Sequence, residues 1–306
     1  MASSSTIPGK SRSSLPAWLA GLGKRTRLVW QARRARRDVI GGGPNADEIR
    51  RMLERAEAFG YFEWPFRLRK DVVGQDVLDV GCGSGLHGLG FIASGARSYT
   101  GVDPSVSPDE DRVRQKRKRK DGRIPFESFG WTPQQIEALL PQVRLVCGTD
   151  QTLPEETTFD RIVLHQVTEH IMDLDLALAR FRRRLRPHGR LLYKHHSYTC
   201  WNGHHRKPKT IDEIDPDDPE QRHYLDWAHL DTRPPEEHSM GMNRVRLDEI
   251  RAMTERHFRV VTWREKESSE RLGGKRLTAD ILARHPGYSR RELATQSVFC
   301  VAEPKA

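Results

Sequence analysis

Four histidines and one cysteine lie close together in the segment KHHSYTCWNGHH, which runs from Lys194 to His205. These residue types support two kinds of chemistry, because an imidazole binds transition metals and also accepts a proton near neutral pH. An unperturbed histidine has a pKa of about 6.5, so most of its population is neutral at pH 7. The segment therefore predicts a metal site, a general base, or a loop whose histidines only pack and hydrogen-bond.

A zinc or iron site would need three or four ligands that converge on one point. The candidate ligands are His195, His196, Cys200, His204, His205 and His229. Their spacing is not that of a structural zinc site, and we predict that no metal is bound. The interpretation that we favour is a catalytic or substrate-positioning role for at least one of the histidines His204, His205, His229 and His195.

A second chemical motif is VLDVGCGSG, which covers Val77–Gly85 and places an acid and then G-x-G-x-G at the end of an apolar run. Glycines at such a turn let backbone N–H groups approach a ligand closely, although dinucleotide-binding proteins carry a similar pattern. Asp103 follows Gly81 by twenty-two residues, where a carboxylate can accept hydrogen bonds from both ribose hydroxyls. Asp150 ends a third apolar run and could meet an adenine amino group.

Strands and helices alternate in the pattern that must position these residues. Short apolar runs predict strands at Val77–Val80, Ser98–Val102, Val143–Cys147, Arg161–His165, Arg190–Lys194, Phe258–Trp263 and Ser297–Ala302. Helices are predicted over residues 16–40, from an Asn45 N-cap to Phe59, and over Leu174–Leu185. This alternation predicts an α/β fold with a doubly wound sheet, whose ligands bind beyond the carboxyl ends of the strands.

Taken together, these motifs resemble the class I S-adenosylmethionine-dependent methyltransferases, in their broad small-molecule branch. The matching positions are Asp79, Gly81, Gly83 and Gly85, then Asp103, Asp150, Phe159-Asp160, Glu169-His170 and Arg186-Pro187-His188-Gly189. His188 stands where the family usually has glycine, in a turn away from the cofactor edge. The resemblance covers about residues 70–195 and implies a Rossmann-like sheet of seven strands.

The resemblance also implies a cofactor, S-adenosylmethionine, and the residues that bind it. These are Asp79, Gly81, Cys82, Gly83, Gly85, Asp103, Pro104, Thr149, Asp150, His165 and Gln166. Asp79 and the glycines would border the methionine portion and the sulfonium. Asp103 would hold the ribose and Asp150 the adenine, while His165 and Gln166 would line the methyl-transfer channel.

The segment after the fifth strand carries a second, looser resemblance. Its pattern "G-x-H … W-x-H-L … N-x-apolar", with Tyr-Ser-Arg-x-x-Leu at Tyr288–Leu293, is similar to a poorly characterised group of bacterial methyltransferases. Such enzymes are often associated with glycan or secondary-metabolite pathways. We therefore predict methyl transfer to an oxygen, or with less support a nitrogen, of a small polar metabolite such as a sugar, with a histidine as general base.

Positive charge is concentrated in two segments. Residues 1–40 carry a net charge of +8 and residues 112–123 carry +7, so the rest of the chain carries −5. A charge run is usually a solvated face, but residues 112–123 could contact nucleic acid and residues 16–40 an anionic membrane or a protein. The alternatives to small-molecule methylation are thus a nucleic-acid methyltransferase and a non-catalytic scaffold that binds S-adenosylmethionine.

The remaining features of the chain predict its organisation and location. The 306 residues contain four scattered cysteines, no paired cysteine motif and no long apolar run, which predicts a cytoplasmic protein without a transmembrane segment. We expect a basic, partly disordered extension over residues 1–44 and a methyltransferase domain over 45–306. Its core would comprise about 70–195 and 246–306, and a lid would be inserted at about 197–245.

Overall fold

The computed structural model describes residues 36–115, 126–231 and 241–305. Most of the basic helix predicted over 16–40, and residues 116–123 of the second basic run, lie outside this part of the chain. The nucleic-acid, membrane and protein contacts predicted for these two runs are therefore not tested. Within the described ranges, no helix is long and apolar enough to cross a membrane.

The described residues form one central sheet of seven strands in the order β5-β2-β1-β6-β7-β9-β8. The strands are β1 (Asp76–Val80), β2 (Ser98–Asp103), β5 (Val143–Cys147), β6 (Phe159–His165), β7 (Leu185–His196), β8 (Phe258–Glu267) and β9 (Thr295–Pro304). The first five strands in the sheet order are parallel, whereas β9 is antiparallel to both β7 and β8. All seven predicted strands are present, which confirms the predicted α/β fold class.

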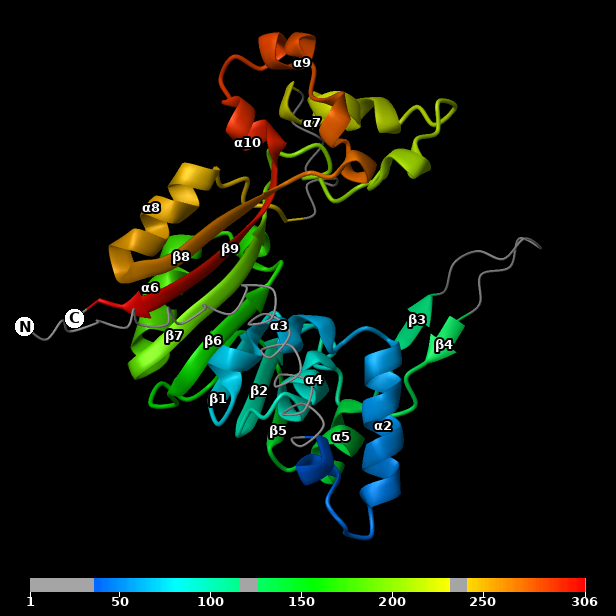
Figure 1. The fold of residues 1–306 in the computed structure, drawn as a ribbon, viewed down its shortest axis with the longest axis vertical. Helices are drawn as coiled ribbons and strands as arrows, with labels where there is room; N and C mark the ends of the chain where they lie inside the picture. The colour runs from blue at the N-terminus through cyan, green and yellow to red at the C-terminus, as the bar shows by residue number, and fades with distance from the viewer. Residues whose placement is uncertain (1–35, 116–125, 232–240, 306) are drawn as a thin grey trace, which may run out of the picture.

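Helices cover both faces of the sheet (Figure 1). On one face lie α2 (Ala46–Ala58), α3 (Glu63–Val72), α4 (His87–Ala93) and α5 (Pro133–Leu139), and on the other α6 (Leu174–Arg184) and α8 (Leu247–His257). A separate apolar cluster fills each interface, one beneath α2–α5 and one beneath α6 and α8. The sheet thus lies between two layers of helices. Because β5, β2, β1, β6 and β7 are parallel, their carboxyl ends meet along one edge of the sheet.

The helices predicted from the Asn45 N-cap to Phe59 and over Leu174–Leu185 form as expected. In α2 the buried residues Ile49, Met52, Leu53 and Ala56 recur at helical spacing, and acidic residues occupy the first turn. Asn45 is the N-cap residue of α2, although its side chain makes no capping hydrogen bond. In α6 the apolar stripe faces the sheet, so the sequence pattern alone sets the orientation of both helices.

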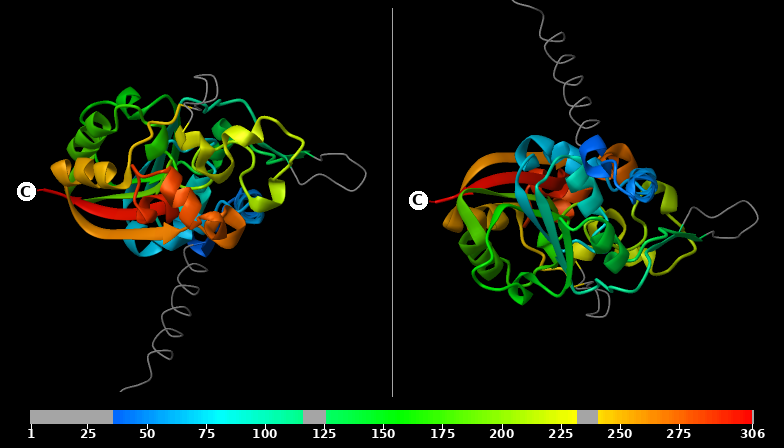
Figure 2. Two further views of the ribbon diagram at one scale, coloured as in Figure 1. Left: turned by 90° about the horizontal axis from the view of Figure 1, so that it is seen from above. Right: turned by 90° about the horizontal axis from the view of Figure 1, so that it is seen from below.

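Three local features differ from the sequence prediction. Residues 186–189, expected as a turn before the fifth strand, lie inside β7, whose pairing with β6 shifts in register between Phe159 and Arg161. In the stretch 106–142 the structure contains α5 and a two-stranded ribbon of β3 (Val113–Gln115) and β4 (Phe126–Ser128). This ribbon stands out from the body of the molecule (Figure 2).

The segment that follows β7 packs beyond one end of the sheet, together with α7 (Ala228–Asp231), α9 (Ala279–Arg284) and α10 (Arg290–Ala294) (Figure 1). We call this part of the molecule the third unit, because its apolar cluster is separate from the two clusters beneath the helices. Its own apolar cluster joins Trp201 and Trp227 to Ile281 and Leu293. Both tryptophans are fully buried, so this unit has a core of its own. It is anchored to the sheet by the strands that leave and enter it, β7, β8 and β9.

We predict that this third core stabilises the fold. Replacement of Trp201 by alanine should lower the free energy of unfolding by about 3–5 kcal/mol, because the change removes a fully buried aromatic ring and leaves a cavity. Urea denaturation measures the change. Leu176→Ala is the control: Leu176 is an exposed residue of α6, and its truncation should change stability by no more than about 0.5 kcal/mol. Equal effects of the two changes would contradict a packed third unit.

Candidate functional site

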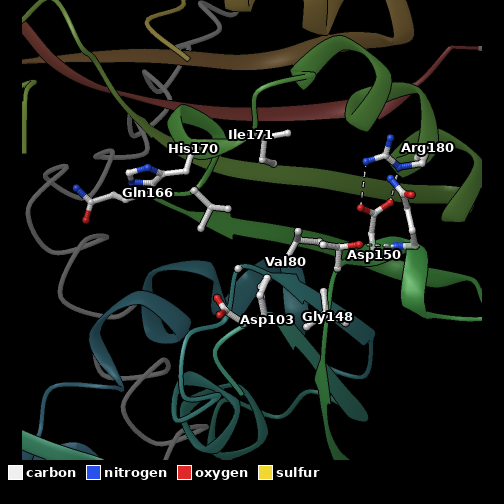
Figure 3. A pocket seen from close by; sticks show the side chains of 14 residues that line it. Val80, Asp103, Gly148, Asp150, Gln166, His170, Ile171 and Arg180 are labelled. Carbon is white, nitrogen blue, oxygen red and sulfur yellow. Dashed lines mark hydrogen bonds and ion pairs between the residues drawn. The ribbon is translucent and has the colours of Figure 1, made fainter. Parts of the chain in front are cut away.

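A cavity of about 540 Å³ lies at the carboxyl ends of β1, β2, β5 and β6 (Figure 3). It falls within the range of small-molecule sites, which are mostly apolar with a few polar groups. The residues that line it are Val80, Gly81, Val102, Asp103, Pro104, Gly148, Thr149, Asp150, Gln151, Gln166, Val167, His170, Ile171 and Arg180. Six of these are predicted cofactor-binding residues: Gly81, Asp103, Pro104, Thr149, Asp150 and Gln166.

The Asp103 carboxylate joins the end of β2 to the glycine loop after β1. Oδ2 accepts a hydrogen bond from the backbone N–H of Gly83 at 2.9 Å, and Oδ1 accepts from the N–H of Ser105 at 2.8 Å. Gly81 and Gly83 have φ of +72° and +59°, a conformation that side chains rarely tolerate. No atom lies within 4 Å of the position that a Cβ on Gly83 would take, so the loop leaves open space there.

The predicted residues Asp79, Cys82, Gly83 and Gly85 are not among those that line the cavity. Asp79 is buried and accepts a hydrogen bond from Tyr99 Oη at 2.9 Å. Burial raises the pKa of Asp79 to about 7, and the negative charge of Asp103 adds to this effect, while the bond from Tyr99 opposes it. Burial also raises the pKa of the Cys82 thiol, so this thiol is not a reactive nucleophile.

Asp150 lies at the other end of the cavity, and its carboxylate is held by Arg180 of α6 (Figure 3). Arg180 Nε donates to Oδ2 at 2.8 Å and a terminal nitrogen donates to Oδ1 at 3.2 Å. Both carboxylate oxygens thus already accept one hydrogen bond in this predicted adenine contact. Arg180 carries no sequence signal of its own, because nothing in the pattern of α6 connects it to a residue thirty positions earlier.

The two residues predicted for the methyl-transfer channel separate at the end of β6. Gln166 lines the cavity, and its amide Nε2 lies 3.3 Å from Nδ1 of His196. His165 points to the face of the sheet covered by α3, where it stacks on Trp64 with ring centroids 4.6 Å apart. Burial lowers the pKa of His165 to about 3, and the nearby charge of Lys194 lowers it further.

Three histidine rings are in contact one after another, and the first of them lines the cavity. His170 lines the cavity, His205 packs against it with ring centroids 5.2 Å apart, and His196 follows at 4.6 Å. Burial is the main cause that lowers the pKa of His205 to about 4 and that of His196 to about 3, so both rings are neutral near pH 7. In the sequence, His170 stands out only as part of the Glu169-His170 motif, and it is not among the predicted catalytic residues.

The other predicted catalytic histidines lie elsewhere. His204 stacks on Tyr224 at 4.7 Å and meets His229 edge-on at 5.1 Å, and both histidines are buried in the third unit. His195 projects from the face of β7 opposite to that of its neighbour His196, and its Nδ1 lies 3.0 Å from Thr168 Oγ1. None of these three, nor His205 itself, is among the described residues that line the cavity. Across the described ranges, no three histidine, cysteine or acidic side chains are arranged to hold a metal ion.

Asn243, at the end of the segment that follows β7, donates hydrogen bonds to the loop that closes one side of the cavity. Its Nδ2 donates to the carbonyl oxygens of Thr168 at 2.7 Å and Ile171 at 2.9 Å. Its backbone N–H donates to the carbonyl oxygen of Glu169 at 2.8 Å. These hydrogen bonds therefore join the third unit to the wall of the cavity.

The geometry fits the predicted S-adenosylmethionine. The carbonyl and carboxylate groups at the ends of β2 and β5 can bind polar atoms of a nucleoside, and Val80, Val102, Val167 and Ile171 offer an apolar surface for a flat base. The open space beside Gly83 admits a ligand close to backbone N–H groups. Asp103 is the residue best placed to hold a ribose, since its carboxylate lines the cavity beside the glycine loop.

Comparison with known proteins identifies one family. A family model described as "Methyltransferase domain" matches residues 35–262 of this chain. An uncharacterized 37.1 kDa protein in transposon TN4556 of Streptomyces fradiae is 33% identical over 120 residues, which cover 39% of this chain and 29% of that protein. The match therefore spans less than a third of the length of this curated relative.

Similar solved structures are more distant. The N-methyltransferase NodS from Bradyrhizobium japonicum is 12% identical, with a TM-score of 0.40 over 83% of this chain and 97% of that one. An S-adenosylmethionine dependent methyltransferase from Mesorhizobium loti is 14% identical, with a TM-score of 0.43 over 79% and 97%. These similarities are weak, and the family assignment rests on the family model.

The buried, neutral histidines predict a loss of stability in acid. Burial lowers the pKa of His204 to about 2, below its unfolded value of about 6.5, so its contribution is complete above pH 6.5 and is lost as the pH falls. Between pH 7 and pH 5, the unfolding free energy of His204→Phe should fall less steeply than that of the wild type, by up to about 1.4 kcal/mol per pH unit. Urea denaturation at both pH values measures this slope. The exposed His223 provides the control: if His223→Phe flattened the slope as much, the assignment to His204 would be wrong.

Proposed function

Because this chain belongs to the methyltransferase-domain family, whose class I members use S-adenosylmethionine, we propose that it methylates an oxygen of a small polar metabolite, such as a sugar or natural-product intermediate. Transfer to nitrogen is the less favoured version of the same proposal. The observation that carries the proposal is the position of the His170–His205–His196 chain beside the cavity: His170 lines the cavity, and His196 contacts Gln166, which also lines it. A polar acceptor that enters beside His170 would meet neutral imidazoles.

The chain's own residues would hold the cofactor and order the site. Asp103 and the glycine loop would bind the ribose and the methionine portion, and Asp150, fixed by Arg180, would face the adenine. When bound, S-adenosylmethionine supplies an electrophilic methyl group. The segment after β7 would act as a lid, because Asn243 ties its end to the loop that carries His170.

A hydroxyl acceptor must lose its proton as the new bond forms, and a positioned base assists this step. We propose that this proton passes to His205 through His170, because His170 lines the cavity and His205 packs against it. The low pKa of His205, about 4, keeps the ring unprotonated at pH 7, although it also makes the ring a weak base. His204, His229 and His195 stay candidates from the sequence, but their buried positions favour a structural role.

We predict that His205→Ala and His170→Ala lower kcat by about 10²–10⁴ while the affinity for S-adenosylhomocysteine stays the same. The assay follows transfer of a radiolabelled methyl group to a panel of sugars and hydroxylated natural products, and mass spectrometry locates the product methyl on oxygen or nitrogen.

His204→Ala is the matched control, because it removes an adjacent imidazole that lies away from the cavity. Its stability should fall, but the kcat of the folded fraction should stay within a few fold of the wild type. Full kcat in both His170→Ala and His205→Ala would contradict the proposed base. If RNA accepted the methyl group and no small molecule did, the proposed acceptor class would be wrong.

A further inference from the structure

A row of side chains crosses four strands on the face of the sheet that α3 covers. Strand pairing aligns one residue from each of β6, β7, β9 and β8, and paired residues project from the same face. These residues are His165, Lys194, Phe299 and Arg264. Trp64 of α3 contacts two of them, stacking on His165 and meeting Phe299 edge-on at 6.0 Å, which confirms their common orientation.

The apolar core on this face ends one row before these residues. The preceding row consists of Val163, Leu192 and Val301, which are all part of the core beneath α2–α5. The row beyond Lys194 pairs Ser297 with His196 on one side and with Lys266 on the other. Two successive rows that contain basic side chains thus lie at the end of the sheet that carries the cavity, although Phe299 of the inner row still packs against the core.

Positive charge gathers on these rows without matching carboxylates. Lys194 is half-buried, and Arg264 and Lys266 are exposed. The carboxylate between the two exposed cations in the sequence, that of Glu265, pairs with Arg291 instead, and no ion pair of the described residues includes Lys194, Arg264 or Lys266. Burial lowers the pKa of Lys194, and the positive charges of Lys266 and Arg67 lower it further, so each of these two cations lies near Lys194. Arg264 stacks over the Phe299 ring, 4.9 Å from its centroid.

Two carboxylates act on this cluster, and neither neutralises it. Glu63 lies 3.7 Å from Arg67 and compensates that exposed cation alone. Glu169 attracts Lys194, but burial raises the pKa of Glu169 to about 7, so a large fraction of it is uncharged near neutral pH. A half-buried ammonium beside two further cations is unfavourable unless an anion joins it, which marks a candidate binding position.

The cluster borders the proposed reaction site at two points. His196, in the outer row, lies 3.3 Å from the amide of Gln166, which lines the cavity (Figure 3). His165, in the inner row, lies beside His87, which follows the glycine loop, with ring centroids 5.6 Å apart. A small molecule that reached the cavity past Gln166 would therefore pass along these cations.

We propose that this cationic face, formed by Lys194, Arg264 and Lys266, binds a phosphate or carboxylate group of the methyl acceptor. The acceptor would then be an anionic metabolite, such as a sugar phosphate or a sugar acid, and not a neutral sugar. This inference rests on the proposed function and names its substrate class. Charge-assisted hydrogen bonds from two or three cations would fix the acceptor's anionic end while its hydroxyl faces the histidine chain.

The test uses simple anions as probes, with the full chain saturated with S-adenosylhomocysteine. The melting temperature is measured against increasing inorganic phosphate in one series and acetate in another, with sodium chloride keeping the ionic strength constant. A ligand that binds the folded state raises the melting temperature in a saturable way. A saturable rise is expected in at least one series, and the larger rise distinguishes a phosphate group from a carboxylate.

Three variants locate the anion. Lys194→Met keeps the half-buried stem of the side chain and removes its charge, while Lys266→Gln and Arg264→Gln change exposed residues and test the site even if the first variant folds poorly. Each should raise the half-saturating anion concentration by about tenfold. Lys70→Met is the matched control, an exposed lysine in the last turn of α3, and should leave that concentration unchanged.

The inference would be overturned if phosphate and acetate raised the melting temperature no more than sodium chloride does. It would also be overturned if the rise were equal in the wild type and in all the variants. Calorimetric titration of S-adenosylhomocysteine on the same samples separates the two levels of the proposal. Intact cofactor binding without anion binding would refute the acceptor class alone, whereas absence of cofactor binding would refute the proposed function itself.

Discussion

The site depends on one carboxylate, that of Asp103, which joins two strands at the edge of the sheet. Its oxygens hold the backbone N–H groups of Gly83 and Ser105, while the N–H groups of Gly81 and Cys82 donate to the carbonyl oxygen of Val102 at 2.8 and 3.2 Å. The glycine loop is thereby fixed against the end of β2. Only glycine adopts this path at low cost, and the absence of side chains leaves room for a ligand.

Around this point the protein buries titratable groups, and burial favours the neutral form of each. Burial raises the pKa of Asp79 and Glu169 to about 7 and lowers that of His196 and His205 to about 3 and 4. Desolvation is the largest cause in all four cases. The third unit thus encloses the histidines near the cavity and removes water from them, which gives neutral imidazoles but makes the unit sensitive to acid.

The sequence was sufficient for the sheet because each strand is a short apolar run with its own turn residues. Six of the residues that line the cavity could also be predicted, since a glycine loop and acids at strand ends are local signals. The bond from Arg180 to Asp150 could not be predicted, because it joins a helix to a loop through long side chains. The ribbon of β3 and β4 was missed for a different reason: its strands are three residues long and adjoin the basic run of residues 112–123. Helix α5 was missed although Thr132, Pro133 and Gln135 form a capping signal at its start.

The histidine-rich segment shows the limit of reasoning from composition. Density of imidazoles suggested chemistry, but packing against Tyr224 and Tyr198 places His204 and His229 in a buried cluster of their own. Two of the four predicted catalytic histidines therefore belong to the core of the third unit. His170 carried a sequence signal, the Glu169-His170 pair after β6, and only the fold showed that this signal lies beside the cavity.

Calorimetric titration of S-adenosylhomocysteine into the wild type and into Asp103→Ala is the most direct test of the central claim that this cavity binds the cofactor. The account predicts one site per chain in the wild type, with micromolar affinity, and binding at least about tenfold weaker in the variant, because a charge-assisted contact is lost. The absence of binding to the wild type, or equal binding to both proteins, would contradict the account.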